Sequence, residues 1–348
     1  MAVLTTTIGA YPKPDFIPVP DWFGNADGTA RHPTTGYLEA LARMGEEGES
    51  LFARGTRQVM EDQVGAGIDI PTDGEIRREN YIHYHCRHID GIDFDTLAST
   101  TMRGHYAAAL PTITGPVKAR DHLLADDWRL AQSFTDRPVK ITLPGPMTIA
   151  DTTANAYYDD EEELGADLAR AVNAEVLSLA QAGCTWIQVD EPVLVRKPDV
   201  ALRYGIRHLD ACFDGVPAHV NRAMHMCCGY PDKLDNENYP KADPEVYLEV
   251  AEAVDNTSIH AVSIEDAHRR NDLSLLDLFR NTRVIIGLVA IARSRVEPVD
   301  EIRSRLDAVL AHVPADRLIA APDCGLGLLG RDLALRKLEN LSEAARCV

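Results

Sequence analysis

Short runs of apolar residues recur along the chain, and most of them are followed by a longer segment with helical spacing. The runs are almost continuously apolar, which is typical of strands that are buried on both faces of a sheet. We predict eight strands, at residues 3–9, 68–71, 139–143, 186–189, 221–226, 260–264, 284–290 and 318–321.

The segments between these strands predict helices. In residues 299–313, for example, Ile302, Leu306 and Val309 lie on one face of a helix. Because strands that alternate with helices form parallel sheets with right-handed crossovers, the pattern indicates an α/β fold. Further helices are expected at residues 37–66, 160–182, 200–213, 244–254, 273–279 and 331–345.

Eight such units match a single (β/α)8 barrel that spans residues 1–348 as one domain. An open doubly wound sheet is the alternative, and Gly325-Leu-Gly-Leu-Leu-Gly330 has the glycine spacing of a dinucleotide site. Such a site needs a further strand and an acidic residue beyond the glycines, so we interpret them as a tight loop. Residues 80–137 interrupt the alternation. We expect them to form an insertion between the second and third strands, with some β structure and a helix near 120–133.

Composition narrows the function classes. The net charge is −19 and no basic patch is visible, which argues against a nucleic-acid partner. The seven cysteines are scattered and odd in number, unlike a disulfide framework. Neither a basic leader nor an apolar run long enough to span a bilayer is present. We therefore expect a soluble, cytoplasmic protein without a membrane partner.

Polar and metal-ligating residues follow five of the predicted strands. In a parallel barrel the carboxyl ends of the strands form one face, which carries the active site. A cluster of ligand types at these positions therefore predicts a functional site. The residues are Glu75, Asp190, His225 with Cys227, Glu265 and Cys324.

Four of these residues form a candidate zinc site. His225 and Cys227 are two apart on a strand and point to the same face, and Glu265 and Cys324 follow later strands. Two thiolates and an imidazole select zinc over magnesium or calcium. With one carboxylate added, the ligands carry −3 against +2 for zinc, so the ion is a poor Lewis acid for hydrolysis. It suits a thiol substrate bound as a thiolate, with the carboxylate as the ligand most readily displaced. Cys228 points to the other face and is expected to be a structural neighbour.

The motifs around these residues resemble the C-terminal catalytic barrel of cobalamin-independent methionine synthase. The likeness runs almost end to end and preserves the order of the motifs. It implies the (β/α)8 barrel, zinc ligands at His225, Cys227, Glu265 and Cys324, and binding of the amino group of a homocysteine-like thiol by Glu75 and Asp190. The motifs are Thr5-Thr-Thr-Ile-Gly-Ala-Tyr-Pro12, Asp73-Gly-Glu75, Pro144-Gly-Pro-Met-Thr148, Gln188-Val-Asp-Glu-Pro192, His225-Met-Cys227, Ser263-Ile-Glu265 and Pro322-Asp-Cys-Gly325.

The sequence also departs from that family. The family's additional N-terminal barrel has no counterpart in these residues, and Ala10 replaces a serine of the amino-acid pocket. Ala290 and Ala292 stand where the family has an Asp and a His, the His being associated with proton transfer. The Trp expected for folate stacking is missing from 149–154. The zinc and thiol half of the chemistry is therefore supported better than the methylfolate half.

Several alternatives stay open. An epoxyalkane:coenzyme M transferase would need cations for a sulfonate, and Arg77, Arg78, Arg293 and Arg295 are candidates, although we favour a solvated rim for them. A methyl-corrinoid protein as methyl donor would explain the missing folate features. A porphyrinogen decarboxylase-like lyase on a related barrel needs no metal, and a metal-storage or regulatory protein would show no turnover.

Two further groups of histidines carry weaker signals. His83, His85 and His88 could be a second metal site, but pocket lining or ordinary surface is the simpler interpretation. His268 follows Glu265 closely and could support a ligand or belong to a loop. The leading hypothesis is a zinc-dependent thiol S-methyltransferase, in which a zinc-bound homocysteine thiolate attacks a methyl group and gives methionine.

Overall fold

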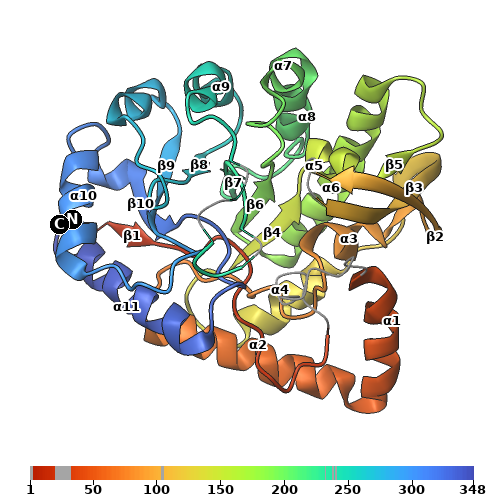
Figure 1. Ribbon diagram of the computed structural model, residues 1–348, viewed down its shortest axis with the longest axis horizontal. Helices are drawn as coiled ribbons and strands as arrows, with labels where there is room; N and C mark the ends of the chain where they lie inside the picture. The colour runs from red at the N-terminus through yellow and green to blue at the C-terminus, as the bar shows by residue number, and fades with distance from the viewer. Residues whose placement is uncertain (1–2, 20–32, 103–105, 232, 237–238, 240) are drawn as a thin grey trace.

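Seven parallel strands form one curled sheet with helices on its outside (Figure 1). The structure, a computed structural model, describes residues 3–19, 33–102, 106–231, 233–236, 239 and 241–348. The strand order is β1-β10-β9-β8-β7-β6-β4, and the sheet therefore starts and ends with strands from the first half of the chain. The strands are β1 (Leu4–Thr5), β4 (Lys140–Pro144), β6 (Trp186–Asp190), β7 (Asn221–Met226), β8 (Ala261–Ile264), β9 (Arg283–Val289) and β10 (Leu318–Pro322).

The second predicted strand, at 68–71, is wrong as a strand of its own. Instead, Ile70 forms a single parallel bridge with Thr6, beside β1, and Thr72 forms one with Lys140 in β4. Pro71 has no N–H to donate to a ladder. The Thr72 N–H is taken by the Gln63 side chain, at 3.0 Å from its Oε1. A regular ladder therefore cannot form here, although the segment still connects to both edge strands of the sheet.

Most predicted helices are present, with three local departures. The helix expected at 37–66 is divided by the 3-10 turn Gly45–Glu47, where Gly45 has φ of +51°. The region 200–213 contains a π turn at Ala201–Gly205, and Leu273–Leu278 is a 3-10 helix. The helices are α1 (Pro33–Met44), α2 (Gly48–Gly65), α3 (Tyr81–Cys86), α4 (Leu124–Gln132), α5 (Pro146–Asp151), α6 (Glu161–Ala182), α7 (Pro198–Val200), α8 (Ile206–Ala211), α9 (Val246–Asp255), α10 (Val299–Val309) and α11 (Arg331–Arg346).

The insertion expected at 80–137 is confirmed as a mixed segment. Its centre is a long antiparallel hairpin of β2 (Ile89–Met102) and β3 (Tyr106–Ala119), and the short strand β5 (Ala154–Asn155) joins β3 in parallel. The helix expected near 120–133 is α4. Figure 1 shows the hairpin projecting beside α6, which β3 contacts.

Two apolar clusters hold the sheet in place. The larger cluster lies between the strands and the surrounding helices, and a smaller one includes Ile8, Ile70, Ala223, Ile285 and Ile319. The start of the described chain lies beside α11, since the Val3 N–H donates to Ala345 O at 3.2 Å. Among the helices of the described residues, none has both the length and the apolar character of a membrane span. All seven cysteines are unpaired, as their scatter predicts.

Candidate metal centre

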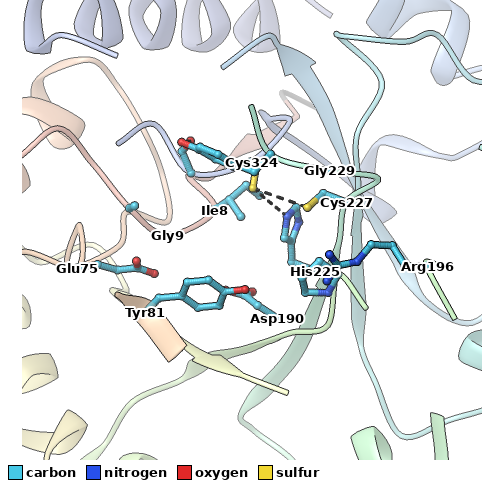
Figure 2. Close-up of a pocket in the computed structure, with 14 residues that line it drawn as sticks. Ile8, Gly9, Glu75, Tyr81, Asp190, Arg196, His225, Cys227, Gly229 and Cys324 are labelled. Carbon is cyan, nitrogen blue, oxygen red and sulfur yellow. Dashed lines mark hydrogen bonds between the residues drawn. The ribbon is translucent and has the colours of Figure 1, made fainter. Parts of the chain in front are cut away.

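His225, Cys227 and Cys324 meet at the carboxyl edge of the sheet (Figure 2). His225 lies near the end of β7, Cys227 follows that strand directly, and Cys324 follows β10. Their potential ligand atoms all lie within 4.8 Å of one another. Within the part of the chain that the structure describes, this is the one group of His, Cys, Asp and Glu side chains that could hold a metal ion.

The orientation of the His225 ring is fixed from the neighbouring strand. Its Nδ1 lies 2.9 Å from Ser263 Oγ, and Ser263 is the residue that pairs with His225 in the ladder between β7 and β8. The ring thereby directs Nε2 toward Cys324 Sγ, at 3.4 Å. A ligating histidine is usually held in this way through its other nitrogen.

The geometry fits a tetrahedral zinc ion. Zinc–sulfur bonds of about 2.3 Å and zinc–nitrogen bonds of about 2.0 Å place two sulfurs about 3.8 Å apart, and a sulfur and a nitrogen about 3.5 Å apart. The observed separations are 4.0 Å between the sulfurs of Cys227 and Cys324, and 3.4 Å between Cys324 Sγ and His225 Nε2. Two of the three separations therefore match those of zinc ligands, and the third is at most 4.8 Å.

The thiols already favour one thiolate without an ion. A hydrogen bond from Cys324, together with the His225 imidazole, holds the pKa of the Cys227 thiol well below its usual value despite burial. A thiolate is the form that binds metals. The negative charge of the Cys227 thiolate therefore favours the binding of a cation at this centre.

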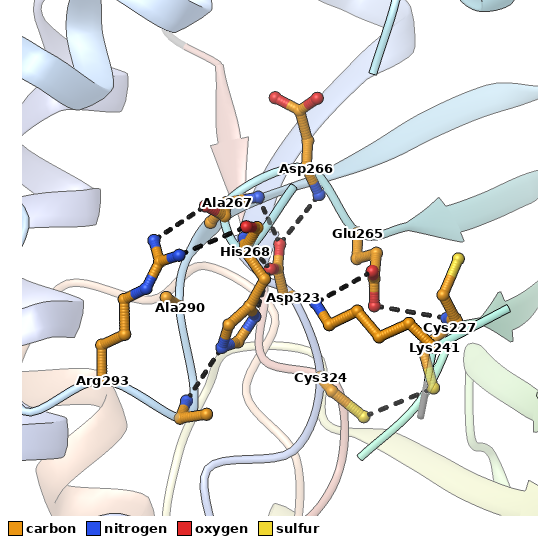
Figure 3. Close-up of polar contacts among 12 residues, drawn as sticks. Cys227, Lys241, Glu265, Asp266, Ala267, His268, Ala290, Arg293, Asp323 and Cys324 are labelled. Carbon is orange, nitrogen blue, oxygen red and sulfur yellow. Dashed lines mark hydrogen bonds and ion pairs between the residues drawn. The ribbon is translucent and has the colours of Figure 1, made fainter. Parts of the chain in front are cut away.

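Glu265, the fourth predicted ligand, follows β8 and lies outside this group of three. Its Oε2 accepts the Cys228 N–H at 3.2 Å, and its Oε1 lies 3.5 Å from Lys241 Nζ (Figure 3). Burial, with the nearby charge of Asp323, raises the pKa of Glu265 to about 7. The Glu265 carboxylate therefore lies beside the group of three, where it contacts the Cys228 N–H and Lys241.

The three metal-ligand candidates form part of the wall of a pocket. Glu75 and Asp190 lie across it from the sulfur atoms in Figure 2, so both predicted substrate-binding carboxylates share this pocket with the metal centre. Ala10, the third predicted substrate contact, also lines it. The lining consists of Ile8, Gly9, Ala10, Glu75, Tyr81, Asp190, Pro192, Arg196, His225, Cys227, Gly229, Tyr230, Cys324 and Gly325.

Glu75 reaches the pocket through an unusual backbone conformation. Its φ is +58°, a left-handed value that costs energy for a residue with a side chain and is often found at functional sites. Its Oε1 accepts a hydrogen bond from Thr142 Oγ1 at 2.7 Å and lies 3.6 Å from Arg78 Nη1. A Cβ at Gly9 would stand 2.6 Å from the same oxygen, so the glycine makes room for the carboxylate.

Asp190, the last residue of β6, is held by a buried chain of side chains. Gln188 Nε2 donates to Asp190 Oδ1 at 2.7 Å, and Lys140 Nζ donates to Gln188 Oε1 at 2.6 Å. Lys140 thus sets which end of the Gln188 amide faces Asp190. Burial raises the pKa of Asp190 to about 7 and lowers that of Lys140 to about 7.

A single buried carboxylate ties together the loops that carry the centre (Figure 3). Asp323 Oδ1 accepts the N–H groups of Asp266 and Ala267 at 2.9 and 2.8 Å. Its Oδ2 accepts the N–H and the ring Nδ1–H of His268, both at 2.7 Å, and His268 Nε2 accepts the Ala292 N–H at 3.0 Å. The loops after β8, β9 and β10 are therefore fixed to one another next to Cys324. His268 belongs to the loop after β8 and contacts Asp323, the residue before Cys324.

The other predicted histidines do not form a second metal site. His83 and His85 are buried on α3, and burial lowers their pKa values to about 4 and about 3. His83 Nε2 lies 3.2 Å from Thr152 O, and His88 Nδ1 pairs with Asp121 at 2.5 Å. Since His83 and His85 neither line the pocket nor lie on the surface, the simpler interpretation is wrong for both.

The predicted sulfonate-binding arginines are engaged elsewhere. Arg78 is 3% exposed and donates to Thr142 O at 2.8 Å, Arg77 pairs with Glu49 and Asp127, and Arg295 pairs with Glu301. None of these, nor Arg293, is among the pocket residues. A solvated rim describes Arg295, whereas Arg77 and Arg78 are largely buried in ion pairs. Arg293 is partly buried and donates to Ala267 O and His268 O.

Ala290 and Ala292 are each 1% exposed and do not line the pocket. Sequence reasoning missed Arg196, Tyr81 and Tyr230, which do. None of the three directly follows a strand. Arg196 lies six residues beyond the end of β6 and Tyr230 four residues beyond the end of β7, and these positions offered a signal.

Residues 3–347 match the catalytic domain of the cobalamin-independent synthase family. The chain is 29% identical to a methionine synthase of Saccharolobus solfataricus, over 99% of this chain and 94% of the relative. A methionine synthase of Thermococcus kodakarensis is also 29% identical, with 99% and 93% covered. Among solved structures, a B12-independent methionine synthase from Shewanella sp. W3-18-1, in complex with selenomethionine, is 28% identical. The two structures superpose with a TM-score of 0.87, and the match covers 100% of this chain and 98% of the Shewanella chain.

The tie at Asp323 predicts a large effect of His268→Ala on stability. The substitution removes a hydrogen bond to a buried carboxylate and leaves the Ala292 N–H without its acceptor. We expect a loss of about 2 kcal/mol in the free energy of unfolding, measured by urea denaturation. His312→Ala is a matched control, because His312 pairs with Asp277 at 3.0 Å on the surface and should change stability by less than about 1 kcal/mol. Equal effects of the two substitutions would contradict the assigned role.

Proposed function

Because the chain belongs to the cobalamin-independent synthase family, through its catalytic domain, we propose that it transfers a methyl group to the sulfur of homocysteine and forms methionine in a zinc-dependent reaction. One observation carries the proposal. A His225–Cys227–Cys324 group with the separations of zinc ligands shares a pocket with two carboxylates suited to an ammonium group. Methionine synthases at 28–29% identity over nearly the whole chain support it.

His225, Cys227 and Cys324 would hold the zinc ion, with Glu265 as the proposed fourth ligand. When bound, zinc lowers the pKa of a thiol and keeps it nucleophilic as a thiolate. Glu265 can serve as an exchangeable ligand because the Cys228 N–H and Lys241 hold its carboxylate when it is not on the ion. A hard carboxylate donor leaves a thiolate-rich zinc site more readily than sulfur does.

The remaining pocket residues orient the substrate. Glu75 and Asp190 are the partners for the ammonium group of homocysteine, since each has one oxygen fixed by a hydrogen bond within the protein. Binding the amino group at one wall sets the distance at which the sulfur meets the opposite wall. Positioning of this kind supplies much of the rate advantage in group transfer.

The proposal includes a closed eight-membered barrel as its scaffold. Residues 70–72 would take the eighth strand position between β1 and β4, on the support of the two single bridges and of backbone hydrogen bonds from Ile70 N to Thr5 O and from Lys140 N to Pro71 O. With that closure, Glu75 would lie at the same edge as the other site residues.

We also propose that the protein is cytoplasmic, a compartment in which its cysteines stay reduced.

A methylated folate and a methyl-corrinoid protein are the two candidate methyl donors. The backbone N–H groups of Ala290 and Ala292 donate to Glu297 and His268, and neither residue offers an acid–base side chain. A donor that requires protonation by the side chain at position 290 or 292 finds no acid–base group at either. The methyl-corrinoid protein is therefore kept as a second candidate donor, beside the methylfolate of the methionine synthase reaction.

The metal centre predicts which cysteines hold zinc. Cys227→Ser and Cys324→Ser each remove a sulfur ligand and should weaken zinc binding by at least about 100-fold. Loss of a residue that only supports a ligand weakens metal binding by up to about 100-fold, and loss of the ligand itself should cost at least as much. Zinc content after dialysis and competition with a coloured chelator measure the effect. Cys228→Ser is the control, because Cys228 adjoins Cys227 yet lies outside the ligand group. An unchanged zinc content in Cys227→Ser and Cys324→Ser would refute the proposed centre.

The raised pKa of Asp190 predicts a pH dependence for substrate selection. The ammonium group of homocysteine binds the ionised carboxylate, which loses population as the pH falls through about 7. We therefore expect the affinity for homocysteine, relative to that for 4-mercaptobutyrate, to fall several-fold from about pH 8 to about pH 6. The ratio cancels the shared titration of the thiols, and calorimetry measures both constants. Asp190→Asn should flatten the ratio, and a flat ratio in the unaltered protein would contradict the assigned role.

A further inference from the structure

A chain of buried polar side chains leads from the amino end of β4 to the pocket. Lys140 is the first residue of β4, and Gln188 and Asp190 belong to β6, which is its neighbour in the sheet (Figure 1). Lys140 and Gln188 are both 0% exposed. Branched apolar side chains usually fill the space enclosed by such a sheet. A fully buried lysine at this place is costly and therefore calls for a specific reason.

The Gln188 amide has a matching partner for each of its polar groups. Its Oε1 accepts a hydrogen bond from Lys140 Nζ at 2.6 Å. Its Nε2 donates to Asp190 Oδ1 at 2.7 Å and to Ile8 O at 2.8 Å. The carbonyl thus meets a donor and the two N–H groups meet acceptors. A reversed amide would set its oxygen against two other oxygens, so only one orientation satisfies all three partners.

This single amide holds two walls of the pocket. Asp190 and Ile8 both line the pocket, and Ile8 continues into Gly9 and Ala10, which line it as well. Gln188 thereby connects β6 to a segment 180 residues away in the sequence. Lys140 itself is not among the lining residues. Any influence of Lys140 on a ligand must therefore pass through the amide.

A purely structural role is the simpler alternative, and Lys337 shows what such a role looks like. Lys337 is the other lysine with 0% exposure among the described residues. Its Nζ contacts the Glu297 carboxylate directly, at 2.8 Å, in a compact ion pair. Lys140 instead donates to a neutral amide that leads on to a carboxylate of the pocket. Hydrogen bonds arranged in such a chain polarise one another, so the two ends are coupled.

We propose that Lys140 is a positioning residue, which acts through Gln188 to fix Asp190 and the backbone at Ile8. The inference rests on the proposed function, in which Asp190 meets an ammonium group. Without Lys140, the Gln188 Oε1 would be buried without a donor, and the amide would lose one of the contacts that set its orientation. Selection for an amino group should then weaken. The metal-binding wall, which the amide does not contact, should be unaffected.

The test measures selection for the amino group in zinc-loaded protein at about pH 8. Homocysteine and 4-mercaptobutyrate, which lacks only the amino group, are titrated by calorimetry. Lys140→Met should lower the ratio of the two affinities about 10-fold, through weaker binding of homocysteine. The affinity for 4-mercaptobutyrate and the zinc content after dialysis should not change. A fall of all three quantities together, or an unchanged ratio, would overturn the proposal.

A double-mutant cycle tests the route through the amide. Gln188→Met should lower the ratio at least as much as Lys140→Met. The double variant should be no worse than Gln188→Met alone, because Lys140 then has no amide on which to act. Additive effects would overturn the proposal. An unchanged ratio in Gln188→Met would do so too, even if Lys140→Met did not fold.

Lys337→Met is the matched control. It also removes a fully buried lysine, but Lys337 pairs with Glu297 and does not line the pocket. We expect this variant to lose stability towards urea and to keep the affinity ratio of the unaltered protein. An equal fall of the ratio in Lys337→Met and Lys140→Met would overturn the proposal, because the effect would then come from general destabilisation.

The failures of the two proposals are distinguishable. If the unaltered zinc-loaded protein binds neither thiol, or binds homocysteine no better than 4-mercaptobutyrate, the proposed function fails and the role of Lys140 fails with it. If the unaltered protein prefers homocysteine and Lys140→Met keeps that preference, only the assignment of Lys140 fails.

Discussion

The parallel register of the central strands is the constraint on which the site depends. Asp190 of β6 pairs with His225 of β7, and His225 pairs with Ser263 of β8, so these three residues form one row across the sheet. Parallel strands with this register place their carboxyl ends at one edge, where the loops can bring ligands together. A shift of one residue would turn His225 toward the other face and break the contact with Ser263.

The loops add what the strands alone cannot provide. Cys324 comes from the end of β10, two strands from β8, and Asp323 next to it binds three successive N–H groups of the loop after β8. The metal centre and its supporting carboxylate are thus neighbours in sequence. Positioning Asp323 therefore also positions Cys324, whose sulfur lies 3.4 Å from His225 Nε2 and 4.0 Å from the Cys227 sulfur.

Site residues that lie on a strand or soon after one could be predicted from the sequence, whereas the loop conformations and the residues further along the loops could not. The spacing of His225 and Cys227 and the position of Cys324 after an apolar run follow from strand periodicity. The left-handed conformation of Glu75 depends on the turn at Asp73 and Gly74 and leaves no periodic signal. Arg196 lies in a loop, where the direction of a side chain depends on tertiary packing.

The fold shows the same division. The apolar runs from 139 onward became strands, because burial on both faces determines them. The run at 68–71 did not, because Pro71 and the Gln63 side chain remove the hydrogen bonds that a ladder needs. The burial of His83 and His85 was also unpredictable, since a polar residue on a short helix gives no indication that an insertion will cover it.

The electrostatic design joins two halves of one pocket. The sulfur atoms and the imidazole on one wall suit a cation, and the carboxylates on the other wall suit an ammonium group. Arg196 is the one Lys or Arg side chain among the described residues that line the pocket.

X-ray absorption at the zinc edge tests the central claim most directly, on the zinc-loaded protein with and without homocysteine. The account predicts two sulfur and two nitrogen or oxygen neighbours without the thiol, and three sulfur neighbours with it. A sulfur count that does not rise on adding homocysteine, or a zinc ion without sulfur neighbours, would contradict it.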